Sequence, residues 1–313
     1  MAVITQDTKE GESFSGKSKK VSWERIWAFS GGPFTFEGWP KKNIHTDIDY
    51  ARACGLPDNK VAASATQFQG YLVQLMIDLF GIEWLSRGTM DVKFIRIVNA
   101  GDIITASAAV ISKEKNEHST LFTMNVDCEN QDGEKVLVGT ATGGVGEYVS
   151  DILQTYNERL IEIKDNCTRL AQPGDVSPEP LEYVVTPELN HQFLYAEEDF
   201  SSYYLEEING GDAIVHPALI LNWSNDTRSP SFKAASMQSG EDMWAPIHTR
   251  DETFFINPVR VGKRLKVTWD PIGSYEKRRR LYSVIDILVT DEDGLEIIRR
   301  LYYTILVSPI HKL

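Results

Sequence analysis

The chain has 313 residues, of which 42% are hydrophobic and 25% are charged, and its formal net charge at pH 7 is −13. The length fits two domains, and the composition is typical of a soluble globular protein. The negative charge argues against a nucleic-acid-binding surface, because the phosphate backbone would be repelled overall. This net charge does not exclude a local basic pocket for an anionic ligand.

The N-terminal residues 1–20 are polar and contain no apolar run. We therefore expect them to be poorly ordered, and we expect no secretory signal. The three cysteines, Cys54, Cys128 and Cys167, are widely spaced and lack the paired spacing of a metal site. Reduced thiols and a cytoplasmic location are the resulting predictions.

Residues 21–30 predict a strand that leads into a short helix, with Ser22 as its N-cap. One long apolar helix is expected further on, where apolar residues recur at three- and four-residue spacing over 68–80. Gly81 stands at the position of a left-handed C-terminal cap. No charged side chain occurs between Lys60 and Asp78, so we expect this helix to be wrapped on most sides. Its glutamines and Asp78 argue against a membrane span.

From Asp91 the pattern changes from helical to extended. Over residues 121–128 apolar and polar side chains alternate, which is the period of a strand. A turn at 130–133 and a second run at 136–142 predict the rest of a hairpin.

The same series of strands and turns recurs 161 positions later, where Gly262 and Gly294 match Gly101 and Gly133. We interpret this as an internal duplication, in which the second copy has a shorter helix at 215–223. Each half is then a helix followed by an antiparallel meander. The predicted fold class is α+β, with two antiparallel sheets that are each wrapped around a long central helix.

Domain boundaries follow from this repeat. We expect a flexible segment at 1–20, a first unit at 21–148, a charged helix and a linker at 149–182, and a second unit at 183–313. The linker assignment rests on the proline and glycine residues between 172 and 180.

The one plausible catalytic histidine is His45, in the polar turn Asn43-Ile44-His45-Thr46-Asp47. A single imidazole can act as general acid or base near neutral pH. The alternative is a histidine on the surface, or one whose hydrogen bonds are satisfied in the core. Thr46 and Asp49 also have the spacing of a capping box, in which Asp47 and Asp49 would serve the helix dipole.

Together with residues 50–52 and 55–57, this turn resembles the MaoC-like acyl dehydratases, which are hotdog-fold proteins that include the (R)-specific enoyl-CoA hydratases. The strand at 92–102 and the turns at 131–133 and 292–294 fit the same family. The resemblance covers about residues 20–307 and implies a tandem double hotdog that associates as a homodimer. It also implies a hydro-lyase acting on a 2-enoyl thioester, usually of coenzyme A, with no metal or redox cofactor.

In that family an aspartate five residues before the histidine works with it on a water molecule. His45 matches the histidine, but Pro40 stands at the aspartate position and can neither accept nor donate a proton. Glu37, Asp47 and Asp49 are the candidates to replace the missing carboxylate. We assign His45 and Asp47 as the catalytic residues.

The predicted substrate-binding residues are Asn43 in the turn and four residues at the start of the central helix: Ser64, Ala65, Thr66 and Gln67. Free backbone N–H groups there would hold a thioester carbonyl whose oxygen gains negative charge. Plain helix capping by Ser64 is the alternative. Gln67 and Gln69 are polar in a helix expected to be buried, so each needs a partner, and one of them is a candidate to face the pocket.

The second unit has no Asn-x-His turn before its helix, so we interpret it as degenerate. His216 is an outside candidate for the site, and His248 is expected to be structural. We interpret the basic run at 277–280 as a solvated hairpin tip. Contact with the phosphates of coenzyme A is the less favoured alternative. Two other functions stay open: a hotdog thioesterase, disfavoured because residues 61–77 carry no carboxylate, and a non-catalytic acyl-binding protein, which Pro40 favours.

Overall fold

The computed structural model describes residues 3–53, 56, 60–147, 151–171, 179–205, 213–228 and 245–307. The first unit consists of β1 (Ser13–Ser15), β2 (Lys19–Lys20), α1 (Trp23–Ser30), α2 (Ile48–Ala53), α3 (Ala65–Phe80), η1 (Ile82–Ser86), β3 (Thr89–Phe94), β4 (Ile103–Lys115), β5 (Ser119–Glu129) and β6 (Lys135–Gly146). A helix and a short strand follow: α4 (Ile152–Asn166) and β7 (Arg169–Leu170). The second unit consists of β8 (Leu181–Val184), α5 (Pro187–Glu197), α6 (Ser202–Leu205), α7 (Pro217–Trp223), η2 (Asp226–Arg228), β9 (Ala245–Phe255), β10 (Arg264–Lys277), β11 (Arg280–Asp291) and β12 (Glu296–Val307).

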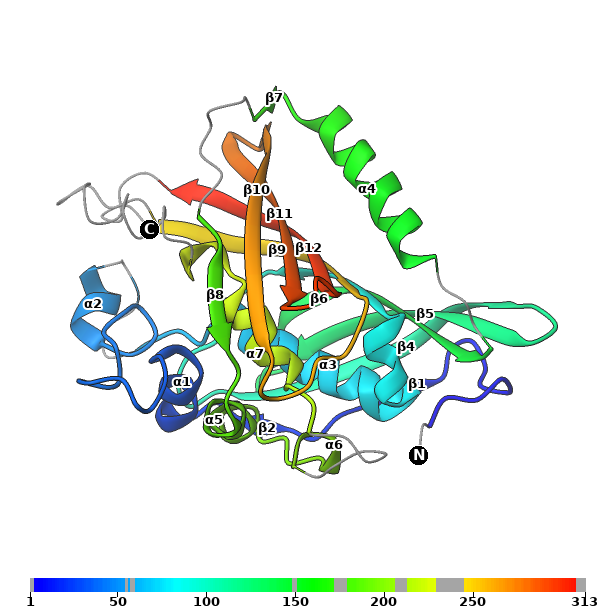
Figure 1. Ribbon diagram of the computed structural model, residues 1–313, viewed down its shortest axis with the longest axis horizontal. Helices are drawn as coiled ribbons and strands as arrows, with labels where there is room; N and C mark the ends of the chain where they lie inside the picture. Colours follow the sequence, from blue (N-terminus) through cyan, green and yellow to red (C-terminus); the bar gives the residue numbers. More distant parts are fainter. Residues whose placement is uncertain are drawn as a thin grey trace.

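The strands form one antiparallel sheet in the order β1-β4-β5-β6-β3-β9-β12-β11-β10-β7, with β2 also paired to β4 and β8 to β10. The sequence predicted an antiparallel sheet for each half, and in the structure the two are joined into one continuous sheet. β3 pairs with β9, with Thr89 opposite Phe254, and this pairing joins the two halves. Each half would otherwise end in an edge strand with unpaired N–H and C=O groups, and the pairing satisfies both edges at once. Figure 1 shows α3 beside α7, with the long strands of the sheet around them.

Matching backbone geometry in the two halves agrees with the predicted duplication. Gly101 and Gly262 have φ angles of 102° and 94°, a region that favours glycine. The Gly101 N–H donates to the Val21 carbonyl at 2.8 Å, and the Gly262 N–H donates to the Val185 carbonyl at 2.7 Å. Val185 therefore corresponds to Val21, and α5 corresponds to α1.

The central helix α3 is enclosed as predicted. All of its residues are buried except Ala65, Gln74 and Asp78. A Cβ atom built on Gly70 would lie 2.9 Å from the Cβ of Ala218, so this glycine allows α3 and α7 to approach closely. The two central helices therefore form one continuous core.

The second central helix is short, as the repeat predicted for residues 215–223, although the fold class assigned a long central helix to each half. α7 has 7 residues and ends at Trp223, because polar residues replace the apolar stripe from Ser224 onward. The Ser224 hydroxyl donates to the Ile220 carbonyl at 2.7 Å, and the buried guanidinium of Arg300 donates to the Leu221 carbonyl at 2.8 Å. The Ile220 carbonyl also accepts the Ser224 backbone N–H, so these bonds together close the C-terminus of α7.

The N-terminal residues, for which we expected little order, are built into the fold. β1 and β2 pair with β4. Ile4 is buried in the main core, and its N–H donates to the Leu79 carbonyl at 2.9 Å. This segment closes the first half beside α3.

The charged helix predicted at 149–170 corresponds to α4. Its apolar residues Ile152, Tyr156 and Ile163 pack with Phe254 and Leu301 in a second core, apart from the core that holds α3 and α7. Most of the predicted linker, residues 172–178, lies outside the described residues. The basic run forms the predicted hairpin tip, because Lys277 pairs with Arg280 between β10 and β11. Within the described ranges, every helix is too short or too polar to serve as a membrane span.

Candidate functional site

The turn that holds His45 is shaped by Asn43. The Asn43 side-chain oxygen accepts the His45 backbone N–H at 2.8 Å. The Asn43 amide nitrogen donates to the carbonyls of Ser30 and Lys41 at 3.0 and 3.1 Å. The side chain of Asn43, which we predicted to bind substrate, thus forms hydrogen bonds with backbone groups. These bonds fix the position of His45 in the turn after α1.

The imidazole of His45 is half-buried and has a defined orientation. Nδ1 lies 2.7 Å from the Ala62 carbonyl oxygen. Because a carbonyl oxygen only accepts, Nδ1 carries the proton in this contact and Nε2 keeps its lone pair. Loss of hydration lowers the pKa of His45 to about 4; the bond to Ala62 opposes this shift, and the positive charge of Arg228 adds to it. His45 is therefore neutral near pH 7, which is the form that a general base requires.

The three candidate carboxylates lie at the surface or are used locally. Asp47 Oδ1 accepts the Tyr50 N–H at 2.8 Å, so Asp47 is the N-cap of α2 and the prediction of Thr46 as N-cap was wrong by one residue. This bond is the main cause of the lowered pKa of Asp47. Asp49 pairs with Arg52 at 2.9 Å, and Glu37 is exposed. Among the described residues, the one charged side chain that acts on the pKa of His45 is Arg228, and no carboxylate takes part.

The start of α3 lies next to the same turn, because Ala62 precedes the N-cap Ser64 by two residues. Ser64 makes no side-chain hydrogen bond to the helix backbone. Its hydroxyl lies 3.0 Å from the Thr66 hydroxyl, which also receives a bond from the Asn225 amide at 3.4 Å. The first N–H groups of α3, including that of Ala65, are therefore not capped by the N-cap side chain.

The two buried glutamines of α3 find their partners in the second half. Gln67 Nε2 donates to the Ala196 carbonyl and Gln69 Nε2 donates to the Thr253 hydroxyl, each at 3.4 Å. The Oε1 atoms of both have no hydrogen-bond partner. Gln67 thus reaches α5, and its assignment to substrate binding stays a prediction.

The structure adds Arg228, which the sequence analysis missed. Its Nη2 donates to the Asn222 side-chain oxygen at 2.6 Å, and its guanidinium lies 5.5 Å from the centre of the Trp223 ring. Burial lowers the pKa of Arg228 to about 10, an effect that Tyr183 opposes. The signal available in the sequence was the positive charge of Arg228 among the polar residues that interrupt the second helix.

The second half repeats this arrangement without a histidine in the turn. The Asp199 carboxylate accepts the backbone N–H of Ser201 at 3.1 Å, as Asn43 does for His45. His216 is the N-cap of α7, where the first half has Ser64. His216 Nδ1 accepts the Ala218 N–H at 3.2 Å, and Nε2 lies 3.3 Å from Asp199. Both ring nitrogens are used within the fold, so the geometry gives His216 a structural role.

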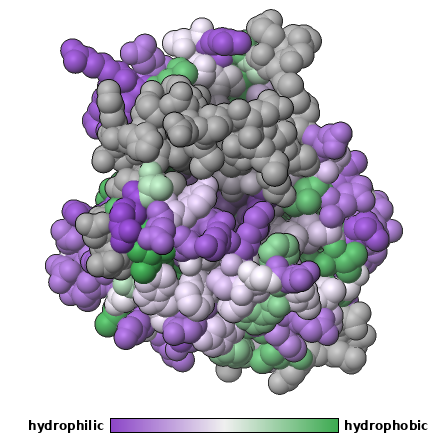
Figure 2. Space-filling model, turned by 90° about the vertical axis from the view of Figure 1, so that its left-hand side faces the viewer, coloured by the Kyte–Doolittle hydropathy of each residue, from purple (hydrophilic) through white to green (hydrophobic). Residues whose placement is uncertain are grey.

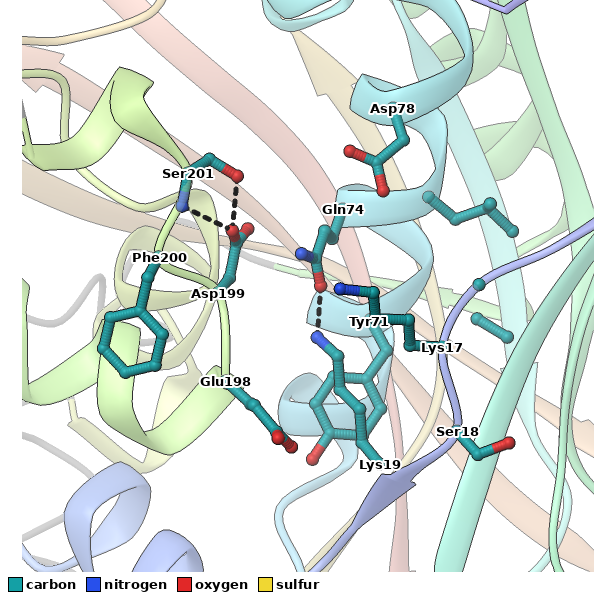
Figure 3. A pocket seen from close by; sticks show the side chains of 13 residues that line it. Lys17, Ser18, Lys19, Tyr71, Gln74, Asp78, Glu198, Asp199, Phe200 and Ser201 are labelled. Atoms are coloured by element: carbon teal, nitrogen blue, oxygen red, sulfur yellow. Dashed lines mark hydrogen bonds between the residues drawn. The ribbon is translucent and has the colours of Figure 1, made fainter.

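A cavity of about 550 Å³ adjoins this second turn (Figure 3). It is lined by the turn residues Asp199 and Ser201 of the second half, and by Lys19, Tyr71 and Gln74 of the first. The cavity therefore combines the turn of one half with the strand and the helix of the other.

Two aromatic residues of the second half correspond in position to Lys19 and Tyr71. Tyr183 precedes Val185 by two residues, as Lys19 precedes Val21, and Trp223 follows its N-cap by seven residues, as Tyr71 does. The ring centres of Tyr183 and Trp223 lie 4.7 Å apart, and Lys19 Nζ lies 4.6 Å from the Tyr71 ring centre. Tyr183 and Trp223 therefore hold the positions in the second half that Lys19 and Tyr71 hold in the first, and Arg228 lies over Trp223.

The outer surface on the side of α1 and α2 is mostly hydrophilic (Figure 2). Its hydrophobic side chains are scattered in small groups among the coloured atoms. The coloured part of this face therefore shows no large apolar patch of the kind that marks a protein interface. In the part of the chain that the structure describes, no three His, Cys, Asp or Glu side chains gather as metal ligands.

Comparisons with known proteins identify the fold. No protein-family model and no curated protein matches the chain. Its structure is similar to that of a putative MaoC-domain dehydratase from Chloroflexus aurantiacus, with 12% identity, a TM-score of 0.66 and 98% of each chain covered. A conserved hypothetical protein from Mycobacterium tuberculosis with a double hotdog fold gives 11% identity and a TM-score of 0.63, with 96% of this chain and 97% of that chain covered.

A third solved structure is the peroxisomal multifunctional enzyme type 2 from Drosophila melanogaster, at 14% identity and a TM-score of 0.52. The match covers 94% of this chain and 48% of that enzyme, so the chain spans about half of its length. These likenesses show that the chain has the double hotdog fold, as the sequence predicted. The identities are too low to carry a function over by themselves.

Proposed function

We propose that the chain is a hydro-lyase of the MaoC-like type, which adds water to a 2-enoyl thioester or removes it from a 3-hydroxyacyl thioester. The observation that carries the proposal is the bond between His45 Nδ1 and the Ala62 carbonyl, which leaves the lone pair of Nε2 without a hydrogen-bond partner among the described residues. The double hotdog fold shared with MaoC-like dehydratases supports it. The proposed substrate is a thioester of coenzyme A. The proposed form of the protein is a cytoplasmic homodimer.

The proposed reaction needs one imidazole. Nε2 of His45 takes a proton from water while the hydroxide oxygen bonds to C3 of the enoyl group, and the C2–C3 double bond becomes an enolate. The imidazolium then returns the proton to C2. The N–H groups at Ala65 and Thr66 are the proposed donors to the thioester oxygen, since the N-terminus of α3 favours the charge that develops there.

A second candidate is an acyl-thioester-binding protein without catalysis, because no described carboxylate lies beside His45. The thioesterase hypothesis has less support, since the acidic residue of α3 is Asp78, which lines the other cavity.

One set of assays separates these functions. With a short 2-enoyl-CoA, hydration lowers the absorbance of the conjugated thioester, and His45→Ala should reduce the rate by about 10²–10⁴-fold, the scale of a general acid–base group. His118→Ala, which changes an exposed histidine of the hairpin between β4 and β5, is the matched control. Unchanged activity in His45→Ala ends the proposal. Free thiol released from a saturated acyl-CoA identifies a thioesterase, and binding without either reaction identifies the non-catalytic protein.

A further inference from the structure

Arg228 differs from the other arginines of the core in its partners. Arg159, Arg250 and Arg300 each meet a carboxylate, namely Glu252, Asp91 and Asp251. For Arg228 the structure records one hydrogen-bond acceptor, the neutral amide oxygen of Asn222. Among the described residues no carboxylate meets this half-buried guanidinium. A guanidinium that loses hydration without gaining an anion is costly unless a ligand supplies the charge.

The place of Arg228 follows from the early end of α7. Where the first half continues α3, the second half leaves its helix at Trp223 and forms η2, which ends with Arg228. The guanidinium packs over Trp223, and the Arg228 N–H donates to the Asn225 carbonyl at 2.9 Å. The Asn225 amide donates to the Thr66 hydroxyl at the start of α3, where the Ala62 carbonyl holds His45. Arg228 therefore belongs to the same site as the proposed base, and it comes from the other half of the chain.

We propose that Arg228 binds a carboxylate on the acyl group of the substrate, so that the site takes thioesters of dicarboxylic acids. This inference rests on the proposed function. A carboxylate on the acyl chain lies near the reacting carbons, and so within the region where Arg228 and His45 meet. The phosphates of a nucleotide carrier lie at the far end of the long pantetheine arm.

The bound carboxylate also supplies a charge that the chain lacks. With Pro40 at the position of the family's aspartate, His45 has a cation nearby and no described carboxylate. An anion paired with Arg228 offsets this positive charge and favours the imidazolium that forms when His45 takes a proton from water. The substrate thereby assists its own hydration.

Two stable thioethers of coenzyme A test the binding without catalysis. S-(3-carboxypropyl)-CoA and S-butyl-CoA have acyl-like chains of equal length that end in a carboxylate or a methyl group. By titration calorimetry the wild type should bind the carboxylate about 10- to 100-fold more tightly, the range of a charge-assisted hydrogen bond. Arg228→Met should remove the preference, Arg228→Lys should keep part of it, and Arg264→Met, at an exposed arginine, should leave it unchanged.

The phosphates of the coenzyme A moiety contribute equally to the binding of the two thioethers. If Arg228→Met weakens both alike, Arg228 serves the carrier and the inference is overturned. Equal binding of the two by the wild type, or no binding of either, overturns it as well. This comparison within the wild type holds even if Arg228→Met folds poorly, and Arg228→Gln is then the second variant.

Turnover separates this inference from the proposed function. Crotonyl-CoA and fumaryl-CoA differ in the same way, by a methyl or a carboxylate group at C4. Hydration of both at equal rates supports the proposed function and overturns the role of Arg228. A carboxylate preference in binding without hydration of either leaves the role of Arg228 standing and rejects the hydro-lyase.

Discussion

Nδ1 of His45 lies 2.7 Å from the carbonyl oxygen of Ala62, two residues before the N-cap of α3. This bond joins the polar turn after α1 to the backbone that enters the central helix. The imidazole and the first N–H groups of α3 are consequently held by one junction. A base and a set of oxyanion donors need such a fixed relation, because small displacements cost much of the rate.

The first prediction concerns the missing carboxylate. Asp47→Asn should keep hydration within about threefold of the wild type, since asparagine is an equally good N-cap and the reaction is proposed to run on one imidazole. Steady-state rates with a short 2-enoyl-CoA give the answer. Asp49→Asn and Glu37→Gln, at exposed positions, are controls for the loss of a nearby negative charge. A loss of about 100-fold in Asp47→Asn alone would assign Asp47 as a second acid–base group.

The second prediction is a pH profile. The pKa of His45 is lowered to about 4, so the neutral base persists well below pH 6.5 and is lost as the pH falls through about 4. The value of kcat/KM should therefore be nearly constant from pH 7 down to about 5 and should then fall. A profile with an acid limb near pH 6.5 would show an imidazole in contact with water and would contradict the described environment.

The third prediction tests the N-terminal segment with two neighbouring residues. Ile4 is buried and Val3 is 55% exposed, although the N–H groups of both donate to the Leu79 carbonyl. Ile4→Ala should lower the free energy of unfolding by about 2–5 kcal/mol, and Val3→Ala by about 0.5 kcal/mol or less. Denaturation in urea measures both. Equal small effects would mean that this segment does not stabilise the fold.

The sequence predicted those parts of the fold that depend on local pattern. The alternation at 121–128 and the apolar stripe of α3 are periodic, and the repeated glycines at 101 and 262 mark turns with positive φ angles. β1 and β2 were missed because they have 3 and 2 residues, and their pairing is decided by β4. The single sheet was missed because the pairing of β3 with β9 leaves no periodic signal in either strand.

The residues of the candidate site also fall into those that a local pattern predicted and those that depend on the packing of the two halves. His45 and Asn43 were found because they stand together in one short turn. Arg228 was missed, since 183 positions separate it from His45 and only the crossed packing of the two halves brings them together. Thr46 was preferred to Asp47 as N-cap because both residue types suit that position, and the choice depends on where α2 begins.

The last prediction concerns the pair of Arg300 and Asp251, which are both fully buried. Arg300 Nε lies 3.1 Å from Asp251 Oδ2, and the same guanidinium donates to the Leu221 carbonyl at the end of α7. Arg300→Met leaves a buried carboxylate without its cation, so it should lower the free energy of unfolding by about 3–5 kcal/mol. Lys263→Met, which breaks a largely exposed pair with Asp293, should cost about 1 kcal/mol or less. Asp251→Leu added to Arg300→Met should recover part of the loss, because it removes the unpaired charge. If the single and the double variant are equally destabilised, the lost support for α7, and not the unpaired charge, accounts for the effect.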